Sequence, residues 1–193
     1  MTLPDFSGTQ DRAAPFPHFL VPELLSEQTA DALLDWLDLG APWALKIADF
    51  YEQHEFSLID VALPDDLSHI ASRDFVSAVG GELSARLEAP ALTLVDISAH
   101  RLLQGQTIRI HNDNIGDEET HRLVVQLNHG WAVEQGGLLM LFSENDPESV
   151  TDVMIPAHRS AFGFEISAGS FHAVSTIHAG RRDTLVYTFR KAA

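Results

Sequence analysis

Side chains able to bind a metal stand together at one point of the sequence. His111-Asn112-Asp113 is the only place where a histidine is followed two residues later by a carboxylate. Residues i and i+2 of an extended strand point to the same face, so we expect both side chains to bind one ion from one side. With 10 histidines and 28 acidic residues in 193, about 1.5 such pairs arise by chance, so the prediction needs support from elsewhere.

That support lies downstream, where His172 enters an apolar segment. Together with His111 and Asp113 it would place two imidazoles and one carboxylate on one face of a metal and leave three positions open. This arrangement suits high-spin Fe(II), which binds a bidentate co-substrate together with O2. Zinc prefers a closed tetrahedron or a single open position. The other eight histidines show no ligand spacing, and we assign them no role.

An α-keto acid co-substrate would explain two further residues. 2-Oxoglutarate chelates iron through its keto and C1 carboxylate oxygens, so its C5 carboxylate is buried beside the metal. A buried carboxylate needs a partner, and a guanidinium provides two parallel hydrogen bonds. Arg182 and Thr184 are i and i+2 of one predicted strand, so both can face the pocket, and the hydroxyl adds a donor. Arg181, on the opposite face, is the competing candidate.

Composition excludes several classes of function. The chain has 12 basic and 28 acidic residues, giving a formal charge of −16, and we therefore expect neither nucleic acid nor an anionic membrane surface as a partner. The absence of cysteine excludes disulfides, cysteine-bound metals and thiol nucleophiles. Neither a long apolar run nor a signal peptide is present, so the expected location is cytoplasmic. The sequence makes no prediction of oligomeric state.

The elements that must position these residues divide into helices and then strands. Ser26 is the expected N-cap of a helix through Leu39, with Gly40 as its stop, and a second helix is expected from about Ser72 or Asp74 to Leu87. We expect residues 1–14 to be loose and residues 15–21 to be extended. After Pro90, short apolar or alternating runs predict eight strands: 92–98, 107–111, 123–127, 138–142, 150–155, 160–164, 173–177 and 184–189.

The predicted fold is mainly β, a sandwich or barrel supported by N-terminal helices. No linker separates the two parts. We therefore expect a single domain over residues 1–193, with 1–90 as helical support and leading strands and 91–193 as the β core. The segments 43–60 and 114–121 have no readable pattern and are expected to be loops that shape the pocket. The acidic run 117–119 is interpreted as a solvated loop, or alternatively as a cap over the pocket mouth.

At this point the sequence resembles the Fe(II)/2-oxoglutarate-dependent oxygenase superfamily, in particular its prolyl 4-hydroxylase-like branch. The resemblance covers roughly residues 15–190 and rests on the order and spacing of several motifs. These are the opening at 15–19, Gly105 six residues before the His-x-Asp motif, the Leu-Asn-x-x-Trp segment at 125–131, the Gly-Gly strand at 135–142, and the second-histidine strand at 172–174 with 180–185.

The resemblance implies a double-stranded β-helix, that is, a jelly-roll or cupin-like core, with N-terminal helices. It implies Fe(II) bound by His111, Asp113 and His172, with 2-oxoglutarate bound at Arg182 and O2 as the oxidant. The implied activity is hydroxylation of a C–H bond in a peptide or small-molecule substrate, peptidyl or free amino-acid-like. Because the carboxylate position holds Asp113, transfer of a hydroxyl is favoured over transfer of a halogen.

The sequence departs from the family pattern at two positions. Leu102 stands where a tyrosine is frequent before the iron motif. Gln126 replaces the tyrosine of the Tyr-Leu-Asn segment, and its amide is a candidate donor to the co-substrate carboxylate. Both changes suggest a substrate other than collagen-like proline. Arg109 shares strand parity with His111, so it is a candidate for a substrate carboxylate, with a rim arginine as the alternative.

Two other functions compete with the oxygenase interpretation. The first is a non-catalytic, cupin-like metal- or ligand-binding β-barrel module that keeps the fold without the chemistry. The second is a zinc or nickel protein that uses the same three ligands. Use of a keto acid at Arg182 would distinguish an enzyme from a binding module.

Overall fold

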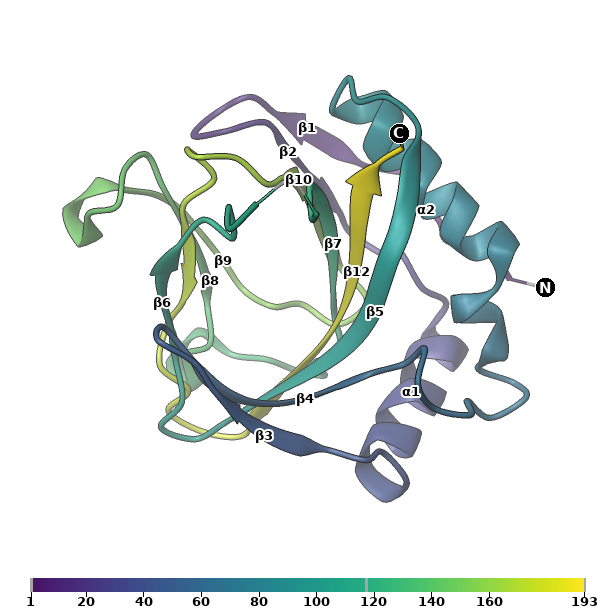
Figure 1. The fold of residues 1–193 in the computed structure, drawn as a ribbon. Helices are drawn as coiled ribbons and strands as arrows, with labels where there is room; N and C mark the ends of the chain where they lie inside the picture. The colour runs from purple at the N-terminus through teal and green to yellow at the C-terminus, as the bar shows by residue number, and fades with distance from the viewer. Residues whose placement is uncertain (1, 117, 193) are drawn as a thin grey trace.

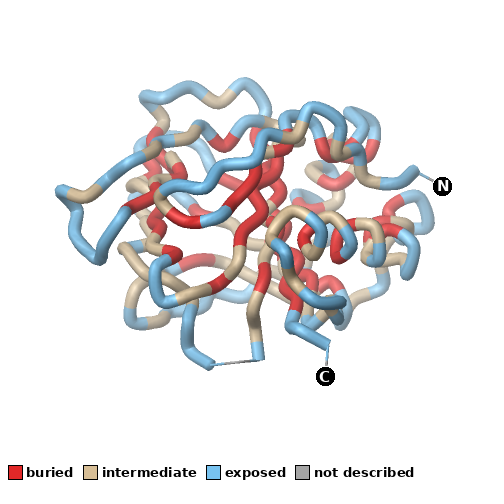
Figure 2. The backbone as a smooth tube through the Cα atoms, turned by 90° about the horizontal axis from the view of Figure 1, so that it is seen from above, coloured by how far each residue is buried: buried red, intermediate tan, exposed pale blue. Residues whose placement is uncertain are grey.

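The structure is a computed structural model that describes residues 2–116 and 118–192. Two antiparallel sheets curve around a common interior, and two helices lie against the outer side of the larger sheet (Figure 1). Buried backbone runs through the middle of the molecule, while the connecting loops around it are exposed (Figure 2). This confirms the predicted mainly-β fold with N-terminal helices.

The larger sheet has eight strands and the smaller has four. In spatial order the larger sheet consists of β1 (Gln10–Arg12), β2 (His18–Val21), β10 (Ala161–Glu165), β7 (His121–Gln126), β12 (Arg181–Lys191), β5 (Leu92–Leu103), β4 (Glu52–Ser57) and β3 (Ala44–Ile47). The smaller consists of β6 (Ile108–His111), β11 (His172–Val174), β8 (Leu139–Phe142) and β9 (Val150–Met154). Short 3-10 turns η1 (Ser68–Ala71), η2 (Val133–Gln135) and η3 (Pro147–Ser149) complete the described elements.

Both helices begin where their capping residues predict. Helix α1 (Glu27–Leu39) is capped by Ser26, whose side chain accepts a hydrogen bond from the backbone N–H of Thr29. Helix α2 (Arg73–Arg86) is capped by Ser72 in the same way and ends one residue before the expected Leu87. Their buried apolar faces join the main hydrophobic core on the outer side of the larger sheet.

The central strands alternate between that core and the interior of the barrel. In β12, Leu185, Tyr187 and Phe189 belong to the core, whereas Arg182, Thr184, Val186 and Thr188 line an internal cavity. In β5, Ile97 and Ala99 face the core, and Asp96, Ser98, His100 and Leu102 face the cavity. Because successive side chains of a strand point to opposite faces, the same strands build the core and the site.

The structure contains all eight strands predicted after Pro90, but three earlier strands differ from expectation. Residues 10–12, expected to be loose, pair with β2. Strands β3 and β4 fall within the segment 43–60, which was expected to be a loop. The residues of β3 are all exposed, so this edge strand lacks the apolar alternation that would have predicted it. None of the helices in the described part of the chain combines the length and apolarity that a bilayer crossing needs.

Candidate metal and co-substrate site

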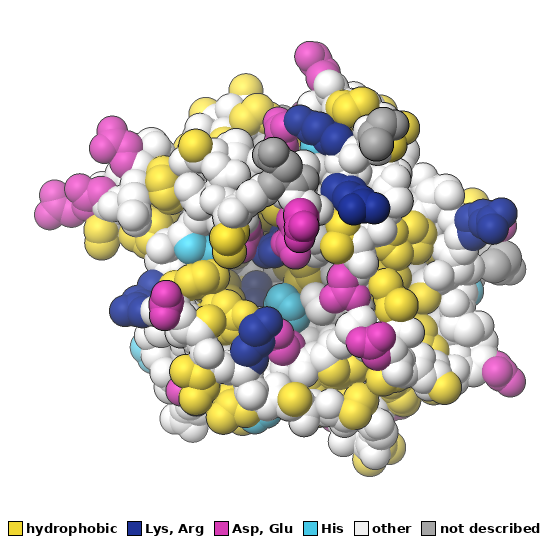
Figure 3. All heavy atoms as spheres, in the orientation of Figure 1, with side chains coloured by type: hydrophobic (Ala, Val, Ile, Leu, Met, Phe, Trp, Pro, Cys, Tyr) yellow, Lys and Arg dark blue, Asp and Glu magenta, His cyan; other side chains and the backbone are white. Residues whose placement is uncertain are grey.

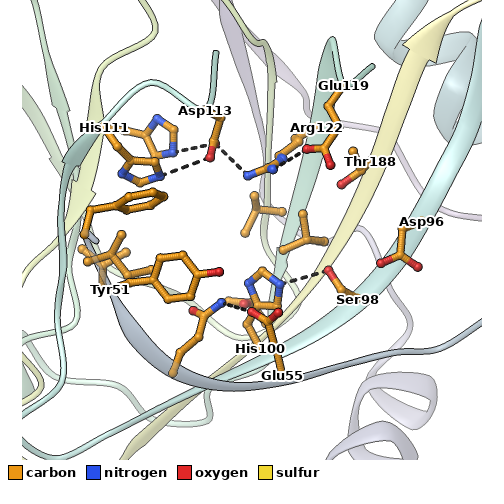
Figure 4. Close-up of a pocket in the computed structure, with 18 of the residues that line it drawn as sticks. Tyr51, Glu55, Asp96, Ser98, His100, His111, Asp113, Glu119, Arg122 and Thr188 are labelled. Carbon is orange, nitrogen blue, oxygen red and sulfur yellow. Dashed lines mark hydrogen bonds and ion pairs between the residues drawn. The ribbon is translucent and has the colours of Figure 1, made fainter. Parts of the chain in front are cut away.

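Three predicted metal ligands meet at one end of the smaller sheet. His111 ends β6 and pairs in register with His172, the first residue of β11. Nε2 of His111 lies 3.4 Å from Oδ1 of Asp113, and Nε2 of His172 lies 3.3 Å from Oδ2. The ligand atoms all lie within 4.8 Å of one another, a spacing that a single ion can bridge (Figure 4).

Hydrogen bonds orient both imidazoles for metal binding. Nδ1 of His111 lies 2.9 Å from the carbonyl oxygen of Arg109, and Nδ1 of His172 lies 2.8 Å from that of Ser170. A carbonyl can only accept, so each Nδ1 donates, and each Nε2 is the ring nitrogen turned toward Asp113 and open to an ion. The donor set of two imidazoles and a carboxylate fits a divalent transition metal.

Asp113 reaches the site through a turn and not through strand alternation, which corrects the sequence argument. Strand β6 ends at His111, and Asp113 adopts a left-handed backbone with φ of 59°, a conformation that non-glycine residues seldom adopt. The side chain of Asn112 accepts from the N–H of Asn114 and donates to the carbonyl of Ala168, and the hydroxyl of Ser170 donates to the Asn112 carbonyl. The turn is thereby tied to the loop that precedes His172.

Arg122 is a site residue that the sequence analysis missed. Its Nη1 lies 2.7 Å from Oδ2 of Asp113, and its Nη2 lies 2.6 Å from Oε2 of Glu119 (Figure 4). Burial alone would raise the pKa of Asp113, but the Arg122 guanidinium and the two histidines hold that pKa well below its usual range. Arg122 and Gln126 are four residues apart in β7 and share a face of the strand. The reasoning that made Gln126 a candidate could therefore also have identified Arg122.

Glu118 and Glu119 line the cavity, so part of the acidic run lies at the pocket as the capping interpretation predicts. Asp117 lies outside the described residues.

Arg182 brings an unpaired positive charge into the cavity. Its side chain is 4% exposed, and no described side chain forms an ion pair or hydrogen bond with its guanidinium. Burial lowers the pKa of Arg182 to about 10, so the group stays charged at neutral pH. Next to it, Asp183 fixes the strand by pairing with Arg101 and by donating its N–H to Asn128.

Arg181, the competing candidate, points away from this site. It is exposed and pairs with Asp38 and Asp183, whereas Arg182 and the buried Thr184 both line the cavity.

The cavity is lined by only one of three further residues that the sequence singled out, which are Gln126, Leu102 and Arg109. Gln126 is buried opposite Thr184, and its Oε1 has no hydrogen-bond partner among the described residues, but its side chain is outside the described cavity lining. Leu102 adds an apolar contact to the cavity wall. Arg109 is exposed and outside the lining, because a register shift between β6 and β11 breaks the alternation on which its prediction depended.

The cavity continues beyond these residues to a volume of about 540 Å³. Its far wall carries Tyr51, Glu55, Ser98 and His100, opposite His111 and Asp113 (Figure 4). In the space-filling view it opens as a hollow near the centre of the face shown (Figure 3). Burial lowers the pKa of His100 to about 4, so this imidazole is neutral at pH 7. Tyr51 and Glu55 come from the segment 43–60, which has no readable pattern, so they could not be predicted from the sequence.

Comparison with known proteins agrees with this geometry. The family model described as "2OG-Fe(II) oxygenase superfamily" matches residues 97–188, the span that carries the three ligands, Arg122 and Arg182. Residues 97–188 are therefore similar in sequence to the 2OG-Fe(II) oxygenases. No curated protein matches the chain. The cofactors of a 2OG-Fe(II) oxygenase are Fe(II), 2-oxoglutarate and O2, as the sequence analysis expected.

Solved structures of prolyl hydroxylases share the fold. A prolyl-4-hydroxylase from Pseudomonas putida matches with a TM-score of 0.69 and 17% identity, over 96% of this chain and 94% of that one. A prolyl hydroxylase from Trichoplax adhaerens, in complex with a hypoxia inducible factor peptide fragment, matches with 0.74 and 15%, over 90% and 83%. The viral collagen prolyl hydroxylase of Paramecium Bursaria Chlorella virus-1 matches with 0.67 and 15%, over 91% and 96%. The likeness confirms the double-stranded β-helix core.

Proposed function

We propose that this oxygenase is a hydroxylase of a peptidyl or free amino-acid-like substrate. His111, Asp113 and His172 bind Fe(II), and Arg182 with Thr184 binds the C5 carboxylate of 2-oxoglutarate. The chemistry that Fe(II) and 2-oxoglutarate supply is the reduction of O2, with one oxygen atom entering the substrate C–H bond and the other leaving in succinate as the keto acid loses carbon dioxide.

The observation that carries the proposal is the unpaired guanidinium of Arg182. A buried cation without a counter-ion is costly, and an anionic ligand would remove that cost. Arg182 faces the same cavity as the three metal ligands, so an anion bound to it can also reach the ion. A diacid that chelates a metal at one end and pairs with a guanidinium at the other fits this arrangement, and a simple metal-binding module has no need of it.

The residues of the chain position the reactants. Arg182 and Thr184 fix the far end of the keto acid, Arg122 holds the oxygen of Asp113 that faces it, and the apolar side chains Leu102, Val174 and Phe164 exclude water from one side of the cavity. The remaining volume, bounded by Tyr51, Glu55 and His100, is left for the substrate. Its polar lining suits an amino-acid residue, free or within a peptide. The Trichoplax relative was solved with a peptide fragment, which supports the peptidyl alternative.

Co-substrate binding tests the proposal directly. Anaerobic addition of Fe(II) and 2-oxoglutarate to the purified chain should produce a weak visible charge-transfer band, and air should then yield succinate. Arg182→Gln should weaken 2-oxoglutarate binding by at least about tenfold, because a charge-assisted bidentate pair is lost. Arg181→Gln, on the neighbouring exposed position, is the matched control and should bind normally.

Equal 2-oxoglutarate binding by both arginine variants would contradict the proposal. Absence of both the band and succinate would favour the cupin-like binding module. A screen of amino acids and short peptides for stimulated succinate release would then define the substrate.

A further inference from the structure

A second cluster of histidine and carboxylate side chains lies outside the cavity. It consists of Asp31 on α1, His129 just after β7, and His158 between β9 and β10. Nε2 of His129 lies 2.6 Å from Oδ1 of Asp31, and Nε2 of His158 lies 3.4 Å from the same oxygen. We propose that these three side chains form a second metal site, for a divalent transition ion of the zinc class, with water completing the coordination.

The state of His158 is the first argument for a ligand. Its side chain is only 11% exposed, yet neither ring nitrogen has a hydrogen-bond partner among the described residues. Buried polar atoms are normally satisfied, and an unsatisfied one indicates a missing partner. Because Nε2 faces the carboxylate of Asp31, a cation between them would satisfy both.

The packing of the two rings is the second argument. The ring centroids of His129 and His158 lie 3.6 Å apart with an interplanar angle of 31°. Two protonated imidazoles would repel each other strongly at this separation. Two imidazoles this close together beside one carboxylate are a set of donors that zinc, nickel and copper ions prefer.

Hydrogen bonds hold the two histidine-bearing segments together. The side-chain amide of Asn128 donates to the carbonyl of Pro156. The backbone N–H of Arg159 donates to the carbonyl of Gln126, and the N–H of Gln126 donates to the carbonyl of Ser160. His129 directly follows one of these two segments and His158 lies within the other. Their backbones are therefore held in fixed relative positions.

Contacts of Arg159 fix the approach to helix α1 in the same way. Its carbonyl accepts from the N–H of Leu24, its Nη1 donates to the carbonyl of Leu25, and its Nη2 lies 2.9 Å from Glu23. These residues lead directly into the helix that carries Asp31. The three ligands come from separate segments, yet the fold sets their positions before any ion binds, which lowers the entropy cost of binding.

The sequence could not predict this cluster, because its members are separated by 98 positions between Asp31 and His129 and share no local spacing. A simple surface ion pair is the competing explanation. It leaves the buried Nε2 of His158 without a hydrogen bond, and an exposed pair such as Asp31 and His129 contributes little stability by itself. The net charge of −16 further raises the local concentration of cations.

Counting bound zinc tests the proposal. The full chain, stripped with a chelator, should bind two equivalents of Zn²⁺ in equilibrium dialysis, one at each cluster. His158→Ala and His172→Ala should each bind one, and the double variant should bind none. A wild-type count below two, or a His158→Ala count equal to wild type, would overturn the proposal. Neither result depends on succinate formation, so failure here is distinct from failure of the proposed hydroxylase.

Two further variants guard against loss of folding. Asp31→Asn changes one exposed oxygen donor and keeps the size of the side chain, and it should weaken the second equivalent at least about tenfold. His178→Ala removes an exposed histidine outside both clusters and should leave the count at two. Co²⁺ should give a visible absorption that His158→Ala reduces and His178→Ala does not. Unchanged zinc affinity in Asp31→Asn would exclude the carboxylate as a ligand and reject the site.

Discussion

Two guanidiniums line the cavity, half-buried at Arg122 and buried at Arg182, and they differ in their partners. Arg122 contacts two carboxylates, Asp113 and Glu119, whereas Arg182 pairs with no carboxylate among residues 2–116 and 118–192. An arginine whose charge is neutralised by carboxylates of the chain needs no further partner. A buried arginine without such carboxylates can bind an anionic ligand. Under the proposed function, Arg122 thus supports the candidate ligand Asp113, and Arg182 is left to bind the co-substrate.

Replacing Arg122 should weaken the metal site without removing a ligand. Arg122→Met deletes the cation that holds Oδ2 of Asp113, and losses of this kind typically lower metal affinity by about 10–100-fold. Anaerobic titration with Fe(II), or with Mn²⁺ as a redox-stable substitute, measures the change. Arg190→Met, at an exposed position of β12, is the control and should bind like wild type. Equal affinity in both variants would show that Arg122 has no influence on the site.

At the scale of residues, sequence reasoning worked where a local motif existed. His111 and Asp113 form a His-x-Asp motif, His172 enters a later apolar segment, and the structure brings the three side chains together. Strand alternation and the family resemblance both indicated Arg182, with Arg181 as the competitor, and burial now separates the two. His100 and Arg122 were missed because their partners are distant in sequence or emerge from loops, and only the folded barrel brings them to one cavity.

At the scale of elements, strand β8 is preceded by two glycines, Gly136 and Gly137, that both have a positive φ angle. Gly136 has φ of 69°, and a Cβ built there would lie 2.0 Å from the carbonyl oxygen of Thr176. That oxygen belongs to the backbone, so it cannot move aside as a side chain would. The chain therefore requires glycine at this position to bring the loop against the segment that follows β11.

Gly136→Ala should destabilise the fold by at least about 2 kcal/mol, because it combines a disfavoured backbone with a backbone clash. Gly81→Ala is the matched control, since it lies within α2 and a Cβ there meets nothing within 4 Å. Alanine in a helix is favoured over glycine by about 0.5–1 kcal/mol, so this variant should gain stability. Urea unfolding of both measures the difference, and a Gly136→Ala variant as stable as wild type would refute the clash.

Element prediction was accurate where boundaries carry their own signals. Ser26, Ser72 and Gly40 mark helix ends through side-chain and backbone hydrogen bonds that depend on neighbouring residues alone. Strands β1 and β3 were missed because they are exposed edge strands without an apolar pattern. Strand β4 was missed because its half-buried residues are polar or charged except Phe56. The register shift of β6 against β11 was also unpredictable, since it arises from pairing between segments distant in the sequence.

For the molecule as a whole, buried neutral histidines should limit stability in acid. His121 is 0% exposed, and burial lowers its pKa to about 4, as it does for His100. Each stays neutral in the folded chain down to about pH 4, whereas the unfolded chain takes up a proton near pH 6.5. Acidification between these values therefore favours unfolding.

Stability should fall as the pH is lowered from 6.5 to 4, by up to about 1.4 kcal/mol per pH unit for each such group. His121→Leu removes one of them, so its unfolding free energy should depend less steeply on pH over this range, whatever its stability at pH 7. Urea unfolding at several pH values gives the two slopes. Identical slopes for the variant and the wild type would show that His121 is not a source of the acid sensitivity.

Strand β12 places alternate side chains in the hydrophobic core and in the cavity. This arrangement limits the insertions and deletions that the protein can tolerate. An insertion or deletion of one residue near the start of this strand would exchange its faces, sending Arg182 toward the helices and Leu185 into the cavity. Such a change would damage folding and catalysis together, with no route to repair by a single further substitution. Variation in length should therefore be confined to exposed connections, such as the one between β8 and β9.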